Sequence, residues 1–371
     1  MCGIAGIIGN YNLHQLDAML LSQQHRGPDF TGKYSDEGFA TLGHNRLAII
    51  DLSPHSNQPF FDTSGRYVIT FNGEIYNYIE LKSELNNHYD FKTESDTEVL
   101  LAAFIIYGKQ CLQKLNGMFA FAIWDIQEKK LFAARDRFGV KPFYYSLKNN
   151  ALYFSSEIKA IHATGVSKIP NEKVWASYFA YGSYGSPDES FWEGVSQLPG
   201  GHFLEVDGCQ SELSQPRASR GVEDLSNKLN LTIEKWYCFE DEVEKQPKNL
   251  TYEKAKDKYL ELLKDSINLR FRADVPVGFN ISGGLDSSVL LALVNDFNSH
   301  PELVEGKQLT ETRLRQAQTD NFKAPQSLIN AYTFCTNNSD YDELPWVESM
   351  IAIAKNPLTK VLLEADEVPD L

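Results

Sequence analysis

The chain opens with Met1-Cys2-Gly3-Ile4-Ala5-Gly6, which places a cysteine directly behind the initiator methionine. Small and branched residues alternate from Cys2 to Ile8, and this alternation predicts a β-strand that begins at the thiol. A small side chain at position 2 permits removal of Met1, and Cys2 would then carry both a thiol and a free α-amine. Because such an amine has a pKa of about 7.7–8.0, it can serve as the general base for the thiol. The opening therefore predicts an N-terminal nucleophile; the alternative is an incidental small residue.

The composition of the 371 residues is that of a globular protein, with 42% hydrophobic and 23% charged residues. A net charge of −15 without a basic cluster argues against nucleic acid as a partner. No apolar run approaches the ~18 residues of a membrane span, and the N-terminus does not resemble a secretion signal. The five cysteines include no Cys-x-x-Cys pair, which favours reduced thiols over disulfides or a zinc site. We therefore expect a cytoplasmic protein that binds neither nucleic acid nor membrane.

Short strands alternate with helices in the first two hundred residues. The apolar spacing predicts helices at His14–Gln24 and Thr97–Tyr107. Besides Cys2–Ile8, the predicted strands are Tyr67–Phe71, Met118–Trp124, Lys130–Ala134, Phe143–Tyr145 and Leu152–Ser155. Asn72-Gly73, directly after the first of these, is a typical turn signal. Together the elements predict an α+β domain of stacked sheets flanked by helices.

The second part of the chain has a different order of elements. The pattern predicts a helix at Tyr252–Arg270, a buried strand at Val275–Ile281, a turn at Ser282–Asp286, a helix at Ser287–Asn295 and a strand at Ala331–Thr336. Strand, turn, helix and strand in this order are the opening of a parallel α/β domain. Two polar blocks, 209–232 and 299–326, interrupt the pattern, and we interpret both as inserted surface loops.

Several polar motifs in the N-terminal half suit hydrolysis of an amino-acid amide. Besides the Cys2 nucleophile, an amide side chain with an adjacent glycine N–H, as in Asn72-Gly73, can hold an oxyanion. A guanidinium can bind a carboxylate through two hydrogen bonds, and carboxylates can bind an ammonium group; such groups occur in His25–Asp29, His44–Asp51 and Ser95–Glu98. Taken singly, Asn72-Gly73 can be a hairpin turn and Asp96 a helix N-cap.

A second motif, Ser282-Gly283-Gly284-Leu285-Asp286-Ser287-Ser288, lies between a predicted strand and a predicted helix. Backbone N–H groups and the helix dipole favour a phosphate anion at such a place. The motif lacks the spaced Gly-Lys-Ser/Thr of a Walker A loop, so it does not predict γ-phosphoryl transfer. Its paired hydroxyls and aspartate suit a pyrophosphate leaving group held with Mg²⁺.

Five segments together resemble the family of glutamine-hydrolysing asparagine synthetases: Met1–Ile4, His25–Asp29, Asn72–Asn77, Arg135–Pro142 and Ser282–Ser288. The resemblance implies a four-layer αββα N-terminal-nucleophile hydrolase domain, followed by a partial α/β parallel-sheet ATP-pyrophosphatase domain. It implies an amidotransferase domain at 1–208 and a synthetase part at 233–371, with 209–232 and 299–326 as insertions. The implied reaction releases ammonia from glutamine and uses it to amidate a β-aspartyl-adenylate made from aspartate and ATP.

Matching positions in the family imply specific roles. Cys2 would be the nucleophile, and Asn72 with Gly73 the oxyanion hole. The implied glutamine site consists of Arg46, Leu47, Ala48, Ile49, Ile50, Asn72, Gly73, Glu74 and Asp96. The implied ATP site consists of Asn280, Ser282, Gly283, Gly284, Asp286, Ser287 and Thr336, where Asn280 replaces a more usual apolar residue. ATP would bring Mg²⁺ with it, and no tightly bound metal is expected.

Two alternatives to asparagine synthesis stay open at this point. The family's synthetase domain runs past Asp366–Pro369, so we expect an incomplete synthetase half and no asparagine formation by residues 1–371 alone. The acceptor could also be another carboxylate, such as a sugar acid or a peptide, or the chain could be a remnant that retains only glutaminase activity. A homodimer is compatible with the resemblance, although the sequence does not specify the oligomeric state.

Overall fold

The computed structural model describes residues 1–9, 11–207, 229–247, 249–299, 329–336 and 342–362. The chain divides into two compact units, Met1–Lys248 and Asn249–Leu371. The block predicted as an insertion at 299–326, apart from Ser299, and most of the block at 209–232 lie outside the described residues. Within the described residues, no helix has the length and apolar character to span a membrane.

The first sheet of the N-terminal unit has the strand order β10-β8-β9-β1-β3-β2 and is antiparallel throughout. Its strands are β1 (Gly3–Gly9), β2 (Phe30–Asp36), β3 (Ala40–Arg46), β8 (Tyr144–Lys148), β9 (Ala151–Ser155) and β10 (Ser196–Gln197). Strand β1 lies between β3 and β9, and all of its residues are buried. Cys2 therefore directly precedes a central, buried strand, as the N-terminal pattern predicts.

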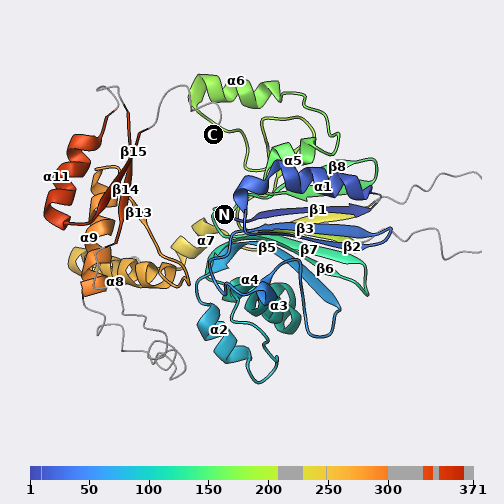
Figure 1. Cartoon of the computed structure of the whole chain (residues 1–371), viewed down its shortest axis with the longest axis horizontal. Coiled ribbons are helices and arrows are strands. Elements are labelled where there is room, and N and C mark those ends of the chain that lie inside the picture. Colours follow the sequence, from blue (N-terminus) through green and yellow to red (C-terminus); the bar gives the residue numbers. More distant parts are fainter. Residues whose placement is uncertain (10, 208–228, 248, 300–328, 337–341, 363–371) are drawn as a thin grey trace, which may run out of the picture. The chain divides into compact units, whose positions relative to one another are not determined.

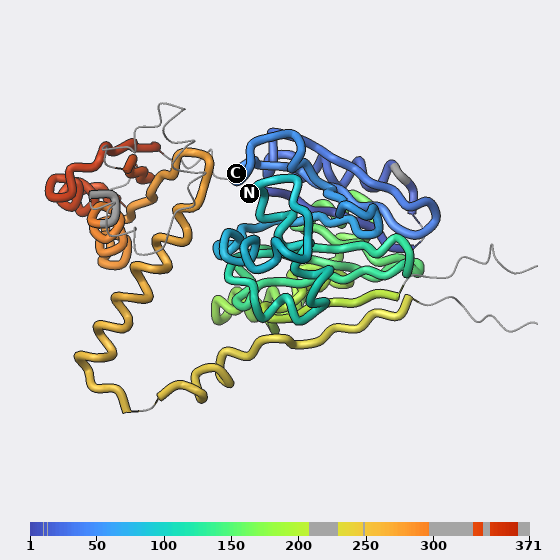
Figure 2. The backbone as a smooth tube through the Cα atoms, turned by 90° about the horizontal axis from the view of Figure 1, so that it is seen from below, coloured from blue at the N-terminus to red at the C-terminus, as the bar shows by residue number. Residues whose placement is uncertain are grey.

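The second sheet has the order β12-β11-β7-β6-β5-β4 and is also antiparallel. Its strands are β4 (Phe60–Phe61), β5 (Tyr67–Ile75), β6 (Gly117–Asp125), β7 (Lys130–Arg135), β11 (His202–Asp207) and β12 (Asn230–Lys235). Strand β12 pairs with β11 at one edge, where Figure 2 shows it in yellow. The compact N-terminal unit therefore includes β12 and extends to Lys248.

Helices cover the outer faces of the two sheets, and the four layers αββα that the family resemblance implies are confirmed (Figure 1). The first sheet carries α1 (Leu13–Ser22) and α5 (Ile158–His162), and the second carries α2 (Tyr78–Leu85), α3 (Asp96–Tyr107) and α4 (Cys111–Lys114). The unit also contains α6 (Glu172–Tyr181), α7 (Phe239–Glu244) and the 3-10 turns η1 (Gln24–Arg26), η2 (Pro54–Ser56) and η3 (Gly108–Gln110).

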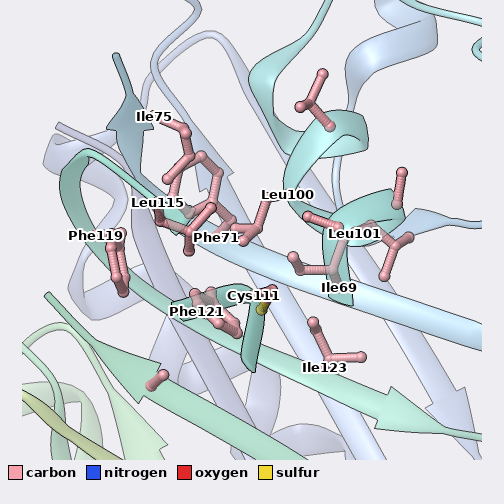
Figure 3. Packing of buried hydrophobic residues seen from close by; sticks show 14 of the residues in the cluster. Ile69, Phe71, Ile75, Leu100, Leu101, Cys111, Leu115, Phe119, Phe121 and Ile123 are labelled. Carbon is pink, nitrogen blue, oxygen red and sulfur yellow. The ribbon is translucent and has the colours of Figure 1, made fainter. Parts of the chain in front are cut away.

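The alternation of side chains along β5 fixes which residues face each layer. Ile69, Phe71 and Ile75 point toward α3 and form a buried cluster with Leu100 and Leu101 (Figure 3). The residues between them on β5 therefore face the first sheet, since successive side chains of a strand point to opposite faces. Val68 belongs to the core between the two sheets, and Thr70 Oγ1 donates a hydrogen bond to Gly43 O at 3.0 Å. The same alternation places Asn72 on the side of β5 that faces the Cys2 strand.

Asn72-Gly73 is not a turn, contrary to the sequence prediction. Strand β5 continues through both residues to Ile75, with Asn72 opposite Ala120 and Gly73 opposite Phe119. A Cβ at position 73 would lie 2.3 Å from the carbonyl oxygen of Met118. Glycine is therefore required by the close approach of two backbones and not by a chain reversal.

The second unit contains a parallel sheet in the order β13-β14-β15, so the predicted parallel α/β character is confirmed. Its elements are α8 (Tyr252–Arg270), β13 (Phe279–Asn280), α9 (Leu285–Ser299), β14 (Ala331–Cys335), α11 (Leu344–Ala354) and β15 (Leu358–Leu362). The predicted strand at 275–281 is reduced to the two paired residues of β13, and α9 is longer at both ends than the predicted helix. A small core of Ile281, Leu291, Ala331 and Val347 joins sheet and helices.

Candidate active site

A cavity of about 360 Å³ opens beside Cys2 in the N-terminal unit. It is lined by Met1, Cys2, Arg46, Leu47, Ile49, Ile50, Ser56, Gln58, Phe71, Asn72, Gly73, Glu74, Ser95, Asp96, Thr97, Met118 and Lys141. The structure thus brings together the predicted nucleophile, oxyanion hole and glutamine site, which come from segments far apart in the sequence. Of the predicted set, Ala48 does not belong to this lining, and its backbone N–H donates a hydrogen bond to Asp29 Oδ2 at 2.8 Å.

The Cys2 thiol is held by the backbone that follows β3. Leu47 N donates to Sγ at 3.4 Å, and Sγ donates to Leu47 O at 3.5 Å. Arg26 Nε donates to the carbonyl oxygen of Cys2 at 2.9 Å, and Arg26 Nη1 forms an ion pair with Glu157 at 3.0 Å. Arg26 lies in the His-Arg-Gly-Pro-Asp motif, and its residue type alone does not indicate this role. Burial raises the pKa of the Cys2 thiol, so the thiolate needs electrostatic support from its surroundings.

The N-terminal amine lies in the same environment. Met1 lines the cavity, and burial lowers the pKa of its amine, with further influence from the charges of Cys2, Arg26, Lys141 and Glu74. An amine with a lowered pKa is more easily found in its neutral, basic form near pH 7. Once Met1 is removed, this chemistry passes to the α-amine of Cys2, which is attached to the nucleophile itself.

The Asn72 amide is a donor without a partner. Its side chain is buried at 1% exposure, and among the described residues its Nδ2 has no hydrogen-bond partner. A buried donor in this condition costs about 1–3 kcal/mol, so it calls for a functional explanation. Because Asn72 and Gly73 line the Cys2 cavity, the amide is available to an anion that forms there.

Asp96 is a buried carboxyl and not the helix cap that the simplest interpretation of the sequence suggests. Ser95 is the N-cap of α3, and its Oγ accepts from Thr97 N at 3.1 Å. Asp96 Oδ2 accepts a hydrogen bond from Ile75 N at 2.9 Å. Burial, with a contribution from the charge of Glu74, raises the pKa of Asp96 to about 7. Burial disfavours the ionised form of this carboxyl, so a cationic ligand in the cavity would stabilise that form.

Arg46 holds the loop that forms one wall of the cavity. Its Nη1 donates to Ser53 O at 2.9 Å and to Asn57 Oδ1 at 2.7 Å, and its Nη2 donates to Asp51 O. Gln58, whose role the sequence pattern does not indicate, connects the β5 and α3 sides of the cavity. Its Oε1 accepts from Phe71 N at 2.6 Å, and its Nε2 donates to Thr97 Oγ1 at 3.1 Å. The glutamine therefore ties the strand of Asn72 to the helix of Asp96.

The segment that leads to Lys141 is organised around the buried carboxylate of Asp136. Oδ1 accepts from Phe138 N at 3.1 Å and Val140 N at 2.9 Å, and Oδ2 accepts from Phe119 N at 3.1 Å and Lys141 N at 3.0 Å. Four backbone N–H groups thus converge on one side chain, which is 2% exposed. Such charge-assisted hydrogen bonds are stronger than neutral ones and fix the course of the backbone.

The neighbouring guanidinium of Arg135 binds carbonyl groups of the same segment. Its Nε donates to Lys141 O, its Nη1 to Leu198 O and its Nη2 to Gly139 O, each at 2.6 Å. Arg135 and Asp136 therefore hold both the N–H and the carbonyl of Lys141. This pair gives a structural explanation for the Arg135–Pro142 motif, for which the sequence analysis proposed no role.

We expect Asp136→Asn to lower the free energy of unfolding of the N-terminal unit by about 2–4 kcal/mol. The amide keeps the volume of the carboxylate, but its NH₂ group would face backbone N–H donors that need an acceptor. Urea unfolding followed by tryptophan fluorescence measures the loss. Asp207→Asn is the matched control, because Asp207 is exposed and its 3.4 Å ion pair with Lys130 should contribute less than about 1 kcal/mol. Equal midpoints for the two variants would contradict the role given to Asp136.

The predicted ATP residues lie at one edge of the parallel sheet in the second unit. Asn280 ends β13, the loop 282–284 follows it, and Thr336 follows β14, so all stand at the carboxyl ends of adjacent parallel strands. This edge is the usual ligand position in such sheets. The hydroxyls of Ser282 and Ser287 lie 3.2 Å apart, and Asp286 is in the first turn of α9. Gly283 has a φ of +75°, and a Cβ there would lie 2.8 Å from Trp346 Cβ, so both conformation and space require glycine.

Comparison with known proteins gives two family matches. The model for a glutamine amidotransferase domain matches residues 1–215, and the model for asparagine synthase matches residues 258–371. "Asparagine synthetase [glutamine-hydrolyzing] 1" of Bacillus subtilis is 34% identical over 82% of this chain and 45% of its own length. "Putative asparagine synthetase [glutamine-hydrolyzing] 2" of Methanocaldococcus jannaschii is 34% identical over 93% of this chain and 66% of its own length.

A further relative carries a different name. "Amidase chry2" of Gibberella zeae is 34% identical over 76% of this chain and 39% of its own length. The chain thus spans less than two thirds of the length of each of these three relatives.

Proposed function

Because the chain belongs to the glutamine amidotransferase family and carries part of an asparagine synthase domain, we propose that it hydrolyses glutamine at Cys2. With Met1 removed, the α-amine of Cys2 takes the thiol proton, and Sγ attacks the side-chain amide carbon of glutamine. The tetrahedral oxyanion accepts hydrogen bonds from Asn72 Nδ2 and Gly73 N. Ammonia leaves with the proton returned by the amine, and water hydrolyses the resulting thioester to glutamate.

The observation that carries this proposal is the unpartnered Asn72 amide beside the half-buried thiol of Cys2. A partnerless donor at this depth is costly in the resting protein, and an oxyanion would supply the missing acceptor. Glutamate and ammonia should therefore form in equal amounts when the purified chain, with Met1 removed, is supplied with glutamine. Absence of both products from folded, correctly processed protein would refute the proposal.

The cavity wall supports recognition of the amino-acid end of glutamine. Asp96 and Glu74 supply negative charge for the α-ammonium group, and Leu47, Ile49 and Ile50 supply apolar surface for the methylene groups. Arg46 is the proposed partner of the α-carboxylate, although most of its donors already bind the loop that contains Asp51 and Ser53. Its contribution therefore includes shaping the wall on which the carboxylate would rest.

We expect glutamine to bind more weakly as the pH falls through 7. The pKa of Asp96 is raised to about 7, so its carboxyl becomes protonated below that pH and loses its attraction for the α-ammonium group. Calorimetry on the Cys2→Ala variant, which removes thiol chemistry from the measurement, should show Kd rising about five- to tenfold between about pH 7.5 and 6. Asp96→Asn in the same background should give weak binding without this pH dependence. A Kd that stays constant over the range would contradict the assignment of Asp96.

For the second unit we propose a part in ATP-dependent amidation of aspartate by the ammonia released at Cys2, as the ATP-binding portion of a synthetase domain that residues 1–371 alone do not complete. The support is the asparagine synthase match and the placement of the Ser282–Ser288 motif and Thr336 at one sheet edge. ATP would bind with its own Mg²⁺, and Asp286 and the serine hydroxyls are the oxygen donors available near it. Another carboxylate is the second candidate acceptor, because one relative has a name other than asparagine synthetase. Pyrophosphate release, measured with aspartate and with other carboxylic acids on a protein that carries the whole synthetase domain, separates the two.

A further inference from the structure

Lys141 is a buried lysine on the wall of the Cys2 cavity. It is 5% exposed, and it shares the lining with Cys2, Glu74 and Met1. Lysine is rarely buried unless its charge has a partner or a use. Neither the proposed catalytic steps nor the proposed recognition of glutamine assigns this side chain a role.

The backbone of Lys141 is fixed more firmly than a surface lysine would require. Asp136 accepts its N–H at 3.0 Å, and Arg135 donates to its carbonyl at 2.6 Å. The side chains of Asp136 and Arg135 are both charged and buried, at 2% and 5% exposure respectively. The arrangement fixes the backbone of a cationic residue that lines a cavity containing a nucleophile, and such fixing is typical of a functional residue supported by its neighbours.

The charged groups around Cys2 and the N-terminal amine come from five different segments. The N-terminal amine belongs to Met1, Arg26 follows α1, Glu74 lies on β5, Asp96 begins α3 and Lys141 ends the segment that follows β7. Among these, Asp96 raises the pKa of the thiol, whereas the amine and Lys141 lower it. Burial lowers the pKa of Lys141, while the charges of Glu74 and Cys2 act in the opposite direction and favour the ammonium form.

We propose that Lys141 is a positioning residue that stabilises the Cys2 thiolate electrostatically. Arg135 and Asp136 hold its backbone in place. The inference rests on the proposed glutaminase function and deepens it. The transferred proton goes from Sγ to the α-amine, and Lys141 keeps its own proton throughout. A fixed cation near the sulfur offsets the burial that otherwise disfavours the thiolate. The role of the Arg135–Lys141 segment is then to hold a charge beside the nucleophile.

The test is the pH dependence of Cys2 alkylation by iodoacetamide, a reaction that needs the thiolate but no glutamine. Alkylation is followed by mass spectrometry of the N-terminal peptide, so the other cysteines do not interfere. In Lys141→Met the alkylation midpoint should rise by about one pH unit, and the rate near neutral pH should fall about tenfold. Lys141→Arg should keep the midpoint within about 0.3 units of wild type, because the positive charge is retained.

Two controls separate this role from a structural one. Lys130→Met removes one positive charge at the far end of β7, where the side chain is exposed, and should leave the midpoint unchanged. Met is close to lysine in length, so Lys141→Met should leave no cavity; Lys141→Gln serves as a second neutral variant if the first folds poorly. An unchanged midpoint in a folded neutral variant would overturn the proposal. So would an upward shift in Lys141→Arg equal to that of Lys141→Met.

Glutamine hydrolysis, measured on the same proteins, tests the glutaminase proposal separately from the electrostatic role of Lys141. If the wild type releases no ammonia but Lys141→Met still shifts the midpoint, the proposed function fails and the electrostatic role stands. If the wild type is active and the midpoint does not move, the role of Lys141 fails and the glutaminase proposal stands.

Discussion

Replacing Cys2 with alanine is expected to abolish ammonia release from glutamine, with a fall in kcat of at least about 10³-fold. The nucleophile forms the thioester intermediate, and no other described cysteine lines the cavity. The α-amine remains in the variant, but water would have to replace the thiol as nucleophile in a site shaped for sulfur. The fold should be unaffected, since Cys2 precedes β1 and its side chain makes contacts mainly with the backbone of Leu47. Coupled glutamate and ammonia assays measure the loss.

Cys111→Ala is the matched control for this variant. Cys111 lies in the core beneath α3, and burial raises the pKa of its thiol to about 12, so it has no thiolate at neutral pH. Its replacement should cost about 1–2 kcal/mol of stability and leave kcat unchanged. Binding of glutamine to Cys2→Ala, measured by calorimetry, shows that the pocket is intact. Activity above about 1% of wild type in Cys2→Ala would mean that a different group attacks the amide.

The sequence predicted the layers of the fold because local patterns determine them. Strand β1 and helices α3 and α8 lie within one or two residues of their predicted limits, since each shows a clear period or a continuous apolar run. Strand β13 was overestimated because only the end of the hydrophobic segment 275–281 pairs with β14: Phe279 and Asn280 are in register with it, and Ile281 N donates to Tyr332 O. The Asn72-Gly73 signal failed because pairing with β6 decides the conformation of these residues and overrides their local turn preference.

The candidate site was predictable where a side chain has direct chemistry. Cys2, Asn72 and Asp96 carry a nucleophile, an amide donor and a carboxylate, so their residue types suggest their use. Gln58 and Lys141 could not be predicted because their roles depend on tertiary contacts. Gln58 bridges β5 and α3, and the backbone of Lys141 is held by hydrogen bonds to Arg135 and Asp136. Contacts of this kind produce no periodic pattern or characteristic residue spacing in the sequence. The family motif Arg135–Pro142 marked the segment, but only the hydrogen bonds of Asp136 explain it.

Asn72→Ala should lower kcat for glutamine hydrolysis about 10²–10³-fold, with a much smaller change in KM. The amide Nδ2 lacks a partner among the described residues, so its hydrogen bond gains most when negative charge develops on the oxygen of glutamine. Gly73 N would remain as the second donor and account for residual turnover. The variant should not lose stability, because removing an unsatisfied buried donor relieves a cost of about 1–3 kcal/mol. Steady-state kinetics and thermal unfolding of the same preparation measure both effects.

Asn77→Ala provides the opposite pattern within the same Asn-Gly-Glu-Ile-Tyr-Asn motif. Its Oδ1 accepts from Asn116 N and its Nδ2 donates to Lys114 O, both at 2.9 Å, so this amide is fully used in the fold. The variant should lose about 1–2 kcal/mol of stability and keep its kcat. If the unpartnered amide serves the reaction, Asn72→Ala loses activity but keeps its stability. Asn77→Ala then loses stability but keeps its activity. If kcat falls less than about threefold in Asn72→Ala, the Asn72 amide does not stabilise the oxyanion, and Gly73 N is its remaining donor.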